Sequence, residues 1–279
     1  MDKVYIVGNG YIGDYISNIF GDVYHFVGIC RSKKNNCATN ISIDISQNKG
    51  ALHDLIEPEG VIIYLAAPQK EGLTDKTLNN FLSGIKKFNV KKIIYISTSG
   101  VYGDKKDKIV NESSELVPIT DRAKRRVDAE KQIRSSSINY TILRVPGIYG
   151  SKRLPMERIN QRLPLIKPEI CKHTNLIHAK DLAGIIMNCI SNEKTNNIVM
   201  NVSDGTPIKT TDYYLKIYDA LKIDYPVFID YEEANETYDE KRKSFINESR
   251  ILDVSLMESI MPDIIEFKDV INGIKESLQ

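Results

Sequence analysis

The segment KVYIVGNGYIG, residues 3–13, constrains the fold of this chain more than any other feature. It joins the apolar run of residues 4–7 to Gly8, Gly10 and Gly13, which have the spacing GxGxxG. A continuous apolar run rich in β-branched and aromatic residues predicts a strand buried on both faces. In such a turn the first glycine allows a tight bend, the second lets the backbone approach a pyrophosphate, and the third lets the next helix pack closely. The segment therefore predicts a dinucleotide-binding turn at the start of an α/β domain.

An amphipathic helix is predicted directly after this turn, over residues 11–20, because Ile12, Ile16, Ile19 and Phe20 recur on one face. Its first amide groups and the positive end of its dipole would then point at the phosphates. The cofactor contacts predicted in this region are Gly8, Asn9, Gly10, Tyr11, Ile12 and Gly13.

A basic segment follows the second predicted strand, residues 24–29. In NAD-binding proteins an acidic residue about 20 positions beyond the glycines accepts a hydrogen bond from the ribose 2′-hydroxyl. This chain has Arg31, Ser32 and Lys33 there, and cations with a hydroxyl suit a 2′-phosphate. The sequence therefore favours NADP over NAD, with a solvated basic loop as the alternative.

Further strands are predicted at residues 41–45, 61–67 and 91–96, with a helix over residues 74–88. Asp44 ends the third strand, where it could meet the adenine amino group or simply be exposed. Ala66 and Ala67 end the fourth strand and are small enough for a cofactor to pass.

The fifth strand runs into the segment STSGVYGD, residues 97–104, and at this point the chain resembles the extended short-chain dehydrogenase/reductase family. The segments YTILRVPGIYG (140–150), NLIHAKDLA (175–183) and VMNVSDGTP (199–207) extend the resemblance over essentially the whole chain, closest to an atypical, epimerase-like branch. The resemblance implies a Rossmann-type, doubly wound parallel sheet with a small C-terminal substrate lobe. Residues 1–150 and 177–203 would form the dinucleotide-binding domain, and residues 151–176 and 204–279 the lobe. It also implies that Thr98 holds the substrate oxygen and that Pro146 contacts the cofactor.

One departure from the family concerns its catalytic Tyr and Lys, which lie four residues apart on the helix after the fifth strand. Aligned on Ala129 and Glu130, these positions hold Arg122 and Arg126. Arg126 could still bind ribose hydroxyls, but a guanidinium is a poor acid or base at neutral pH. Thr98 and Tyr102 are the remaining candidates for the proton-handling group.

Other residues have simpler explanations. Tyr149 is explained as a wall of the substrate lobe, and His178 and Asp181, by the resemblance, as residues that orient that lobe. A second YxxxK sequence at residues 218–222 is attributed to chance, with Tyr218 as a packing residue. In the C-terminal part, helices are predicted at residues 210–221 and 264–277, and the acidic segment 232–240 is expected to be an exposed loop.

The overall composition restricts the kinds of binding partner that the sequence predicts. Lys and Arg total 38 against 37 Asp and Glu, so the net charge of +1 gives no argument for nucleic acid or an anionic membrane. No apolar run approaches the length of a membrane span, and no metal-ligand cluster is recognisable. Four cysteines without CxxC spacing and an N-terminus that runs straight into a strand predict a cytoplasmic setting. The expected partner is a small-molecule substrate, and an oligomer is possible.

These features together predict an NADP-dependent oxidoreductase that acts on a small carbonyl or imine. Two alternatives stay open: a nucleotide-sugar epimerase-like enzyme, and a non-catalytic NADP-binding sensor, because fold and cofactor binding do not by themselves establish activity.

Overall fold

The computed structural model describes residues 3–32, 36–47, 55–86, 89–239, 242–243 and 246–279. In this part of the chain seven strands form one parallel sheet, in the order β3-β2-β1-β4-β5-β7-β12. Strand order reverses between β1 and β4, which is the crevice where doubly wound sheets bind nucleotides. The seven strands are β1 (Val4–Val7), β2 (Phe26–Cys30), β3 (Thr39–Ser42), β4 (Val61–Tyr64), β5 (Lys92–Thr98), β7 (Tyr140–Val145) and β12 (Ile198–Asn201).

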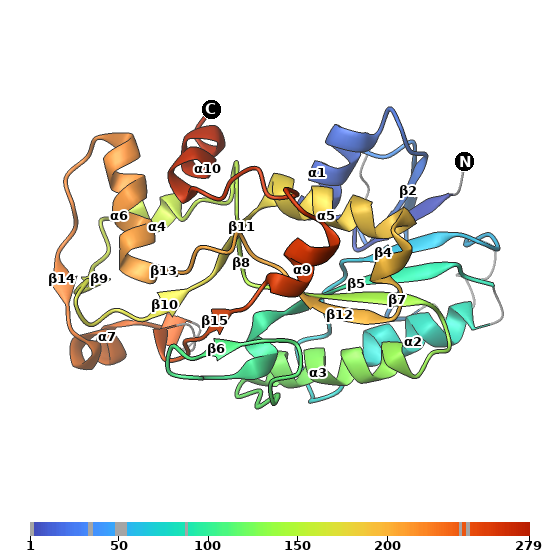
Figure 1. The fold of residues 1–279 in the computed structure, drawn as a ribbon, viewed down its shortest axis with the longest axis horizontal. Coiled ribbons are helices and arrows are strands. Elements are labelled where there is room, and N and C mark those ends of the chain that lie inside the picture. The colour runs from blue at the N-terminus through green and yellow to red at the C-terminus, as the bar shows by residue number, and fades with distance from the viewer. Residues whose placement is uncertain (1–2, 33–35, 48–54, 87–88, 240–241, 244–245) are drawn as a thin grey trace.

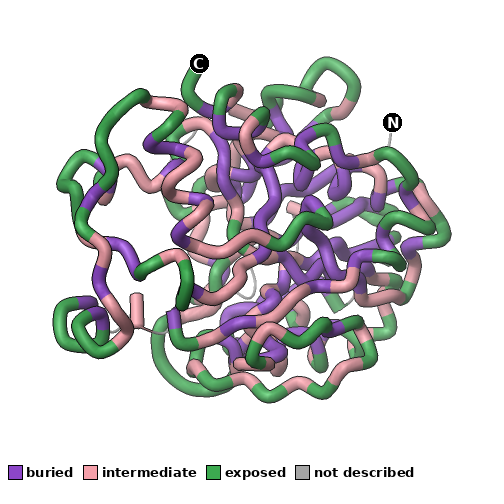
Figure 2. The backbone as a smooth tube through the Cα atoms, turned by 60° about the vertical axis from the view of Figure 1, so that its left-hand side comes forward, coloured by how far each residue is buried: buried purple, intermediate pink, exposed green. Residues whose placement is uncertain are grey.

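Helices cover both faces of this sheet (Figure 1). On one face α1 (Tyr11–Phe20) packs beside α5 (Ala179–Ser191), and on the other α2 (Lys76–Ile85) packs beside α3 (Asp121–Arg134). Each face has its own apolar core, and the central strands β1 and β4 contribute to both, so these strands are buried throughout. Figure 2 shows the same concentration of buried backbone in the sheet region. The predicted α/β class and doubly wound parallel sheet are confirmed.

A smaller lobe lies beyond the carboxyl ends of the strands, at the left of Figure 1. Its core is formed largely by α4 (Met156–Asn160), α6 (Thr210–Leu221) and α10 (Val270–Ser277). A separate cluster beside it includes residues of α7 (Tyr231–Thr237). Short strand pairs complete the lobe: β8 (Gly147–Tyr149) with β11 (Leu176–His178), β9 (Leu165–Ile166) with β14 (Phe228–Ile229), and β10 (His173–Thr174) with β13 (Ile208–Lys209).

The C-terminal part of the chain crosses back to the sheet domain, which the predicted division at residue 204 does not include. Leu252, Val254, Met257, Met261 and Ile265 belong to the apolar core on the α5 side of the sheet. Within this stretch α9 (Ser255–Ile260) lies against β12, and β15 (Ile251–Leu252) pairs with β6 (Ile109–Val110). The sheet domain is therefore completed by residues 252–265 as well.

Two sequence predictions about the C-terminal part are wrong. The acidic segment expected to be a loop contains α7, which Asp230 caps by accepting a hydrogen bond from the Glu233 amide at 3.0 Å. The last helix begins at Val270 rather than at residue 264, because Asp269 caps it there.

The 3₁₀ turns η1 (Ser99–Tyr102) and η2 (Glu193–Thr195) follow β5 and α5. All four cysteines are free thiols. Among the described residues, no helix has the length and apolar character that crossing a membrane requires.

Candidate functional site

The three glycines of the β1–α1 turn meet different surroundings. Gly8 has a φ of +83°, and a Cβ there would lie 2.4 Å from the Ala66 nitrogen. A Cβ on Gly13 would lie 2.2 Å from Asn9 Oδ1, so packing within the protein requires both residues to be glycine. At Gly10 the nearest atom to an added Cβ is the Gly8 oxygen, 3.7 Å away. Protein packing therefore gives no reason for glycine at position 10, whereas a ligand seated on the turn does.

Helix α1 begins at this turn without a side-chain cap. Its first intrahelical bond runs from the Asp14 amide to the Gly10 oxygen at 2.9 Å. The amides of Tyr11, Ile12 and Gly13 have no hydrogen-bond partner in the described part of the chain. Unpaired amides at a helix N-terminus attract anions, and the open space over Gly10 adjoins them. The turn therefore fits a dinucleotide pyrophosphate.

Asn9 and Tyr11 direct their side chains away from this cradle. Asn9 is buried, and its Nδ2 donates to Asn36 Oδ1 at 2.7 Å, which ties the turn to the segment before β3. The Tyr11 hydroxyl donates to the Ser151 oxygen at 2.8 Å, at the entrance to the smaller lobe. Only the main chain of these two residues is available to a cofactor at the turn.

The residues predicted to bind the 2′-phosphate of NADP follow β2. Arg31 and Ser32 are exposed there, and Lys33 lies outside the described residues. Asp44 accepts hydrogen bonds from the amide and the hydroxyl of Ser46, at 2.9 and 2.6 Å, and these bonds lower its pKa. Asp44 therefore stabilises its own turn, and its carboxylate is already engaged.

The other predicted residues gather at the carboxyl edge of the sheet. Ala66 and Ala67 follow β4, Thr98 ends β5, and Pro146 follows β7. Thr98 is half-buried and pairs in register with Val145, so Thr98 and Pro146 are neighbours. The Thr98 Oγ1 accepts a hydrogen bond from the Gly100 amide at 3.2 Å, and its proton remains available for a ligand.

Arg126 reaches the same region from α3. Its Nη1 donates to the Tyr95 hydroxyl at 2.8 Å and to the Ile96 oxygen at 3.1 Å. Arg122 lies one turn earlier on the helix and is exposed. Arg126 therefore lies against the sheet, whereas Arg122 faces solvent.

Tyr102, a candidate for the proton-handling group, ends the 3₁₀ turn η1 after β5, and its side chain lies in the interior. Its side chain is 0% exposed. The hydroxyl donates to Asn201 Oδ1 at 2.7 Å and accepts from Arg144 Nη1 at 2.9 Å. Burial raises the pKa of this phenol. A side chain sealed and paired in this way is a poor candidate for donating a proton to a substrate.

Tyr149, Tyr218 and His178, which the sequence analysis also discussed, make packing and capping contacts within the protein. Tyr149 and Tyr218 are buried in the core of the lobe. His178 caps α5 by accepting at Nδ1 from the Lys180 amide, 3.3 Å away, and its Nε2 lies 3.0 Å from Glu276 Oε2. Burial lowers the pKa of His178, so this imidazole acts as a neutral linker between α5 and α10.

Sequence reasoning missed a buried ion pair beneath the β5 edge. Arg144 Nη2 lies 2.8 Å from Glu130 Oε2, and Glu130 Oε1 accepts from Ser97 Oγ at 2.6 Å. This pair holds the segment before Thr98 against α3. The sequence offered one signal for this pair, which was Glu130. That residue helped to align the helix with the family's catalytic positions, but no role was predicted for it.

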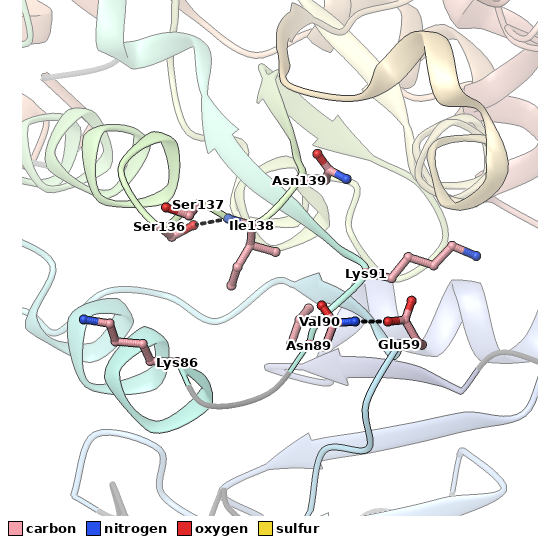
Figure 3. Close-up of a pocket in the computed structure, with 9 residues that line it drawn as sticks. All are labelled: Glu59, Lys86, Asn89, Val90, Lys91, Ser136, Ser137, Ile138 and Asn139. Atoms are coloured by element: carbon pink, nitrogen blue, oxygen red, sulfur yellow. Dashed lines mark hydrogen bonds between the residues drawn. The ribbon is translucent and has the colours of Figure 1, made fainter.

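Figure 3 shows a polar pocket lined by residues such as Glu59, Lys91 and Asn139. These residues precede β4, β5 and β7, so the pocket lies at the amino edge of the sheet. The glycine turn, Thr98 and Pro146 lie at the opposite edge, and the pocket is not part of the candidate cofactor site.

Fold and site together define a class: a Rossmann-type protein with a glycine-rich turn that fits a pyrophosphate at the switch point of its sheet. A family model described as NAD(P)H-binding matches residues 31–193. The chain belongs to this NAD(P)H-binding family.

Solved structures share the fold over nearly the full length. A conserved protein of unknown function from Silicibacter pomeroyi DSS has a TM-score of 0.84 at 19% identity, covering 99% of this chain and 98% of that one. UDP-glucose 4-epimerase from Thermotoga maritima, solved with UDP-glucose, has a TM-score of 0.80 at 20% identity, covering 100% and 97%. UDP-N-acetylglucosamine 4-epimerase from Methanobrevibacter ruminantium M1 has a TM-score of 0.80 at 18% identity, covering 99% and 96%.

A curated relative matches a shorter region. The chloroplast stem-loop binding protein of 41 kDa b from Arabidopsis thaliana is 30% identical over 121 residues. The match covers 41% of this chain and 32% of that protein, so the chain matches about a third of the relative's length.

Proposed function

We propose that this protein is an NADP-dependent oxidoreductase that acts on a small carbonyl or imine substrate. The observation that carries the proposal is the cradle at Gly10, where open space meets the unpaired amides of α1. When bound there, a nicotinamide cofactor supplies or accepts a hydride.

Each residue in the proposal has a task that its position supports. The amides of residues 11–13 hold the pyrophosphate, and Arg31 and Ser32 hold the 2′-phosphate, with Lys33, which lies outside the described residues, as a third candidate from the sequence. Ala66, Ala67 and Pro146 leave a path along the carboxyl edge of the sheet. Arg126 binds the nicotinamide ribose, and the Thr98 hydroxyl orients the substrate oxygen or nitrogen.

The identity of the proton donor decides the substrate class. Reduction of a carbonyl adds a hydride to carbon and a proton to oxygen, and no tyrosine stands where the family has its acid. An imine nitrogen can arrive already protonated, so an iminium needs only the hydride. The interior position of Tyr102 strengthens the case for an imine, with Thr98 as an orienting group.

The proposal is tested by mixing purified protein with NADPH and a panel of small carbonyls and cyclic imines, and following the nicotinamide absorbance. Substrate-dependent NADPH oxidation that is lost in Gly10→Val supports an enzyme. Thr98→Val should then lower turnover by at least about 10²-fold, with NADPH affinity nearly unchanged.

A non-catalytic NADP-binding sensor is the second candidate, and Arg122 at the position of the family's tyrosine favours it. Tight NADPH binding without turnover of any substrate in the panel would replace the enzyme proposal with this one. An epimerase-like activity would appear as interconversion of UDP-sugars without net change in the nicotinamide absorbance.

A further inference from the structure

Within the described residues, one nitrogen of the Arg126 guanidinium makes its hydrogen bonds to the protein. Nη1 makes both hydrogen bonds, to the Tyr95 hydroxyl and the Ile96 oxygen, and the guanidinium carbon lies 5.5 Å from the centre of the Tyr95 ring. Nε and Nη2 have no hydrogen-bond partner in the described part of the chain, and neither is a buried unpaired atom. Three N–H donors of a fixed, planar cation are therefore available to a ligand.

Tyr95 is an acceptor suited to this cation. It lies on β5, fully buried, on the face of the sheet that α3 covers. Burial raises its pKa to about 12, so the phenol stays neutral and offers its oxygen to Arg126. Because the side chain is sealed in the core, it cannot move with Arg126, and it fixes where the guanidinium lies.

Asp75 interacts electrostatically with Arg126, although burial raises the pKa of Asp75 itself. It is buried at the start of α2, where Oδ1 accepts from the Leu78 amide at 2.9 Å while Oδ2 has no partner among the described residues. Its amide donates to Asp128 Oδ2 at 2.8 Å, which ties α2 to α3 two residues beyond Arg126. Burial alone would lower the pKa of Arg126, but Tyr95 and then Asp75 outweigh burial and raise it.

We propose that Tyr95 is a positioning residue that holds Arg126 in place to bind the nicotinamide ribose, with Asp75 as an electrostatic partner of the same guanidinium. The inference rests on the proposed function, because it assigns a task within the same cofactor site. A free arginine side chain loses much rotamer freedom when it binds a ligand, and a guanidinium ordered beforehand avoids that loss. Nε and Nη2 then meet ribose hydroxyls, which a nucleotide without the nicotinamide riboside does not have at this place.

The test compares Tyr95→Phe with Tyr64→Phe as a matched control. The two rings lie 5.9 Å apart on neighbouring strands, but the buried Tyr64 hydroxyl has no hydrogen-bond partner among the described residues, so its removal leaves the bonds of Arg126 intact. Affinities are measured by calorimetry for NADPH and for adenosine 2′,5′-bisphosphate, which carries the 2′-phosphate but no nicotinamide riboside. Tyr95→Phe should weaken NADPH at least about fivefold and change the bisphosphate less than about twofold. Tyr64→Phe should leave both unchanged.

Asp75→Asn gives a second test, because asparagine keeps the oxygen that caps α2 and removes the charge. It should also weaken NADPH selectively. In an Arg126→Met background, neither Tyr95→Phe nor Asp75→Asn should cause further loss.

Equal loss of NADPH and bisphosphate in Tyr95→Phe, or an undiminished effect in the Arg126→Met background, would overturn the positioning role while leaving the proposed function intact. If the unmodified protein binds neither ligand, the proposed function itself fails, and the positioning role fails with it.

Discussion

At the scale of single residues, we expect substitutions at two glycines of the turn to have different effects: one on cofactor affinity and the other on stability. Gly10→Val should abolish NADPH binding, because the added carbons fill the space over the unpaired amides of α1. The free energy of unfolding should change little, since no protein atom lies within 3.4 Å of the added Cβ. Calorimetry for binding and urea unfolding for stability measure the two effects.

Gly13→Ala should behave in the opposite way. Its Cβ would overlap Asn9 Oδ1, which also binds Asn36, so the free energy of unfolding should fall by about 1–3 kcal/mol. Urea unfolding of the purified variant checks this value. If Gly13→Ala is stable and Gly10→Val unfolds, then Gly10 is required for packing and Gly13 is not, which contradicts this account.

Tyr102→Phe addresses a residue that the sequence offered as a catalyst. Removing the hydroxyl leaves the buried Asn201 oxygen and an Arg144 N–H without their shared partner, so we expect a loss of about 1–3 kcal/mol in stability. The affinity for NADPH should stay the same. If stability is retained and turnover on a verified substrate falls about 10²-fold, Tyr102 is a catalytic residue after all.

At the scale of elements, strand patterns and helix periodicity predicted most of the sheet. Helices α1 and α6 have the predicted bounds, because apolar residues repeat along one face of each. Segment 232–240 was misread because its acidic residues suggest a solvated loop. Glu232 and Glu233 instead lie in the first turn of α7, where the helix dipole favours carboxylates, and Ala234 is buried beneath them.

The candidate site was predictable where the main chain forms it and less so where side chains do. The spacing of the glycines locates the pyrophosphate turn, since backbone geometry depends on those positions alone. The burial of Asn9 and Tyr102 depends on Asn36, Asn201 and Arg144, which are distant in sequence. No local pattern carries that information.

The segment after β12 should make stability depend on pH. Asp204 is buried there, accepts from the Thr206 amide at 2.9 Å, and burial raises its pKa from 3.8 to about 7. The folded state therefore binds the proton more tightly than the unfolded state. The contribution of this group to stability is full below about pH 4 and is lost as pH rises toward about 7.

Asp204→Asn should accordingly be more stable than the unmodified protein at about pH 8, by on the order of 2–4 kcal/mol, and similar to it below about pH 4. Asparagine keeps the oxygen that accepts from Thr206 and cannot ionise. Thermal unfolding of both proteins across this range measures the difference. A constant offset at every pH would show that Asp204 does not titrate as its burial requires.

At the scale of the whole molecule, the C-terminal part of the chain joins the lobe to the sheet domain. The carboxylate of Asp181 on α5 accepts hydrogen bonds from the amides of Glu266 and Phe267, at 2.9 and 3.1 Å. Residues 252–265, just before them, pack in the sheet core. The lobe is thus held over the carboxyl edge of the sheet, where the residues of the candidate site lie.

The central claim is that this molecule binds NADP(H) across the carboxyl edge of the sheet, with Arg31 binding the 2′-phosphate. The most direct test is a calorimetric titration of the protein with NADPH and with NADH, repeated for Arg31→Ala. We expect NADPH to bind more tightly than NADH, and Arg31→Ala to weaken NADPH about tenfold or more while changing NADH little. Equal affinities for the two cofactors, or an Arg31→Ala variant that retains the full preference, would contradict this account.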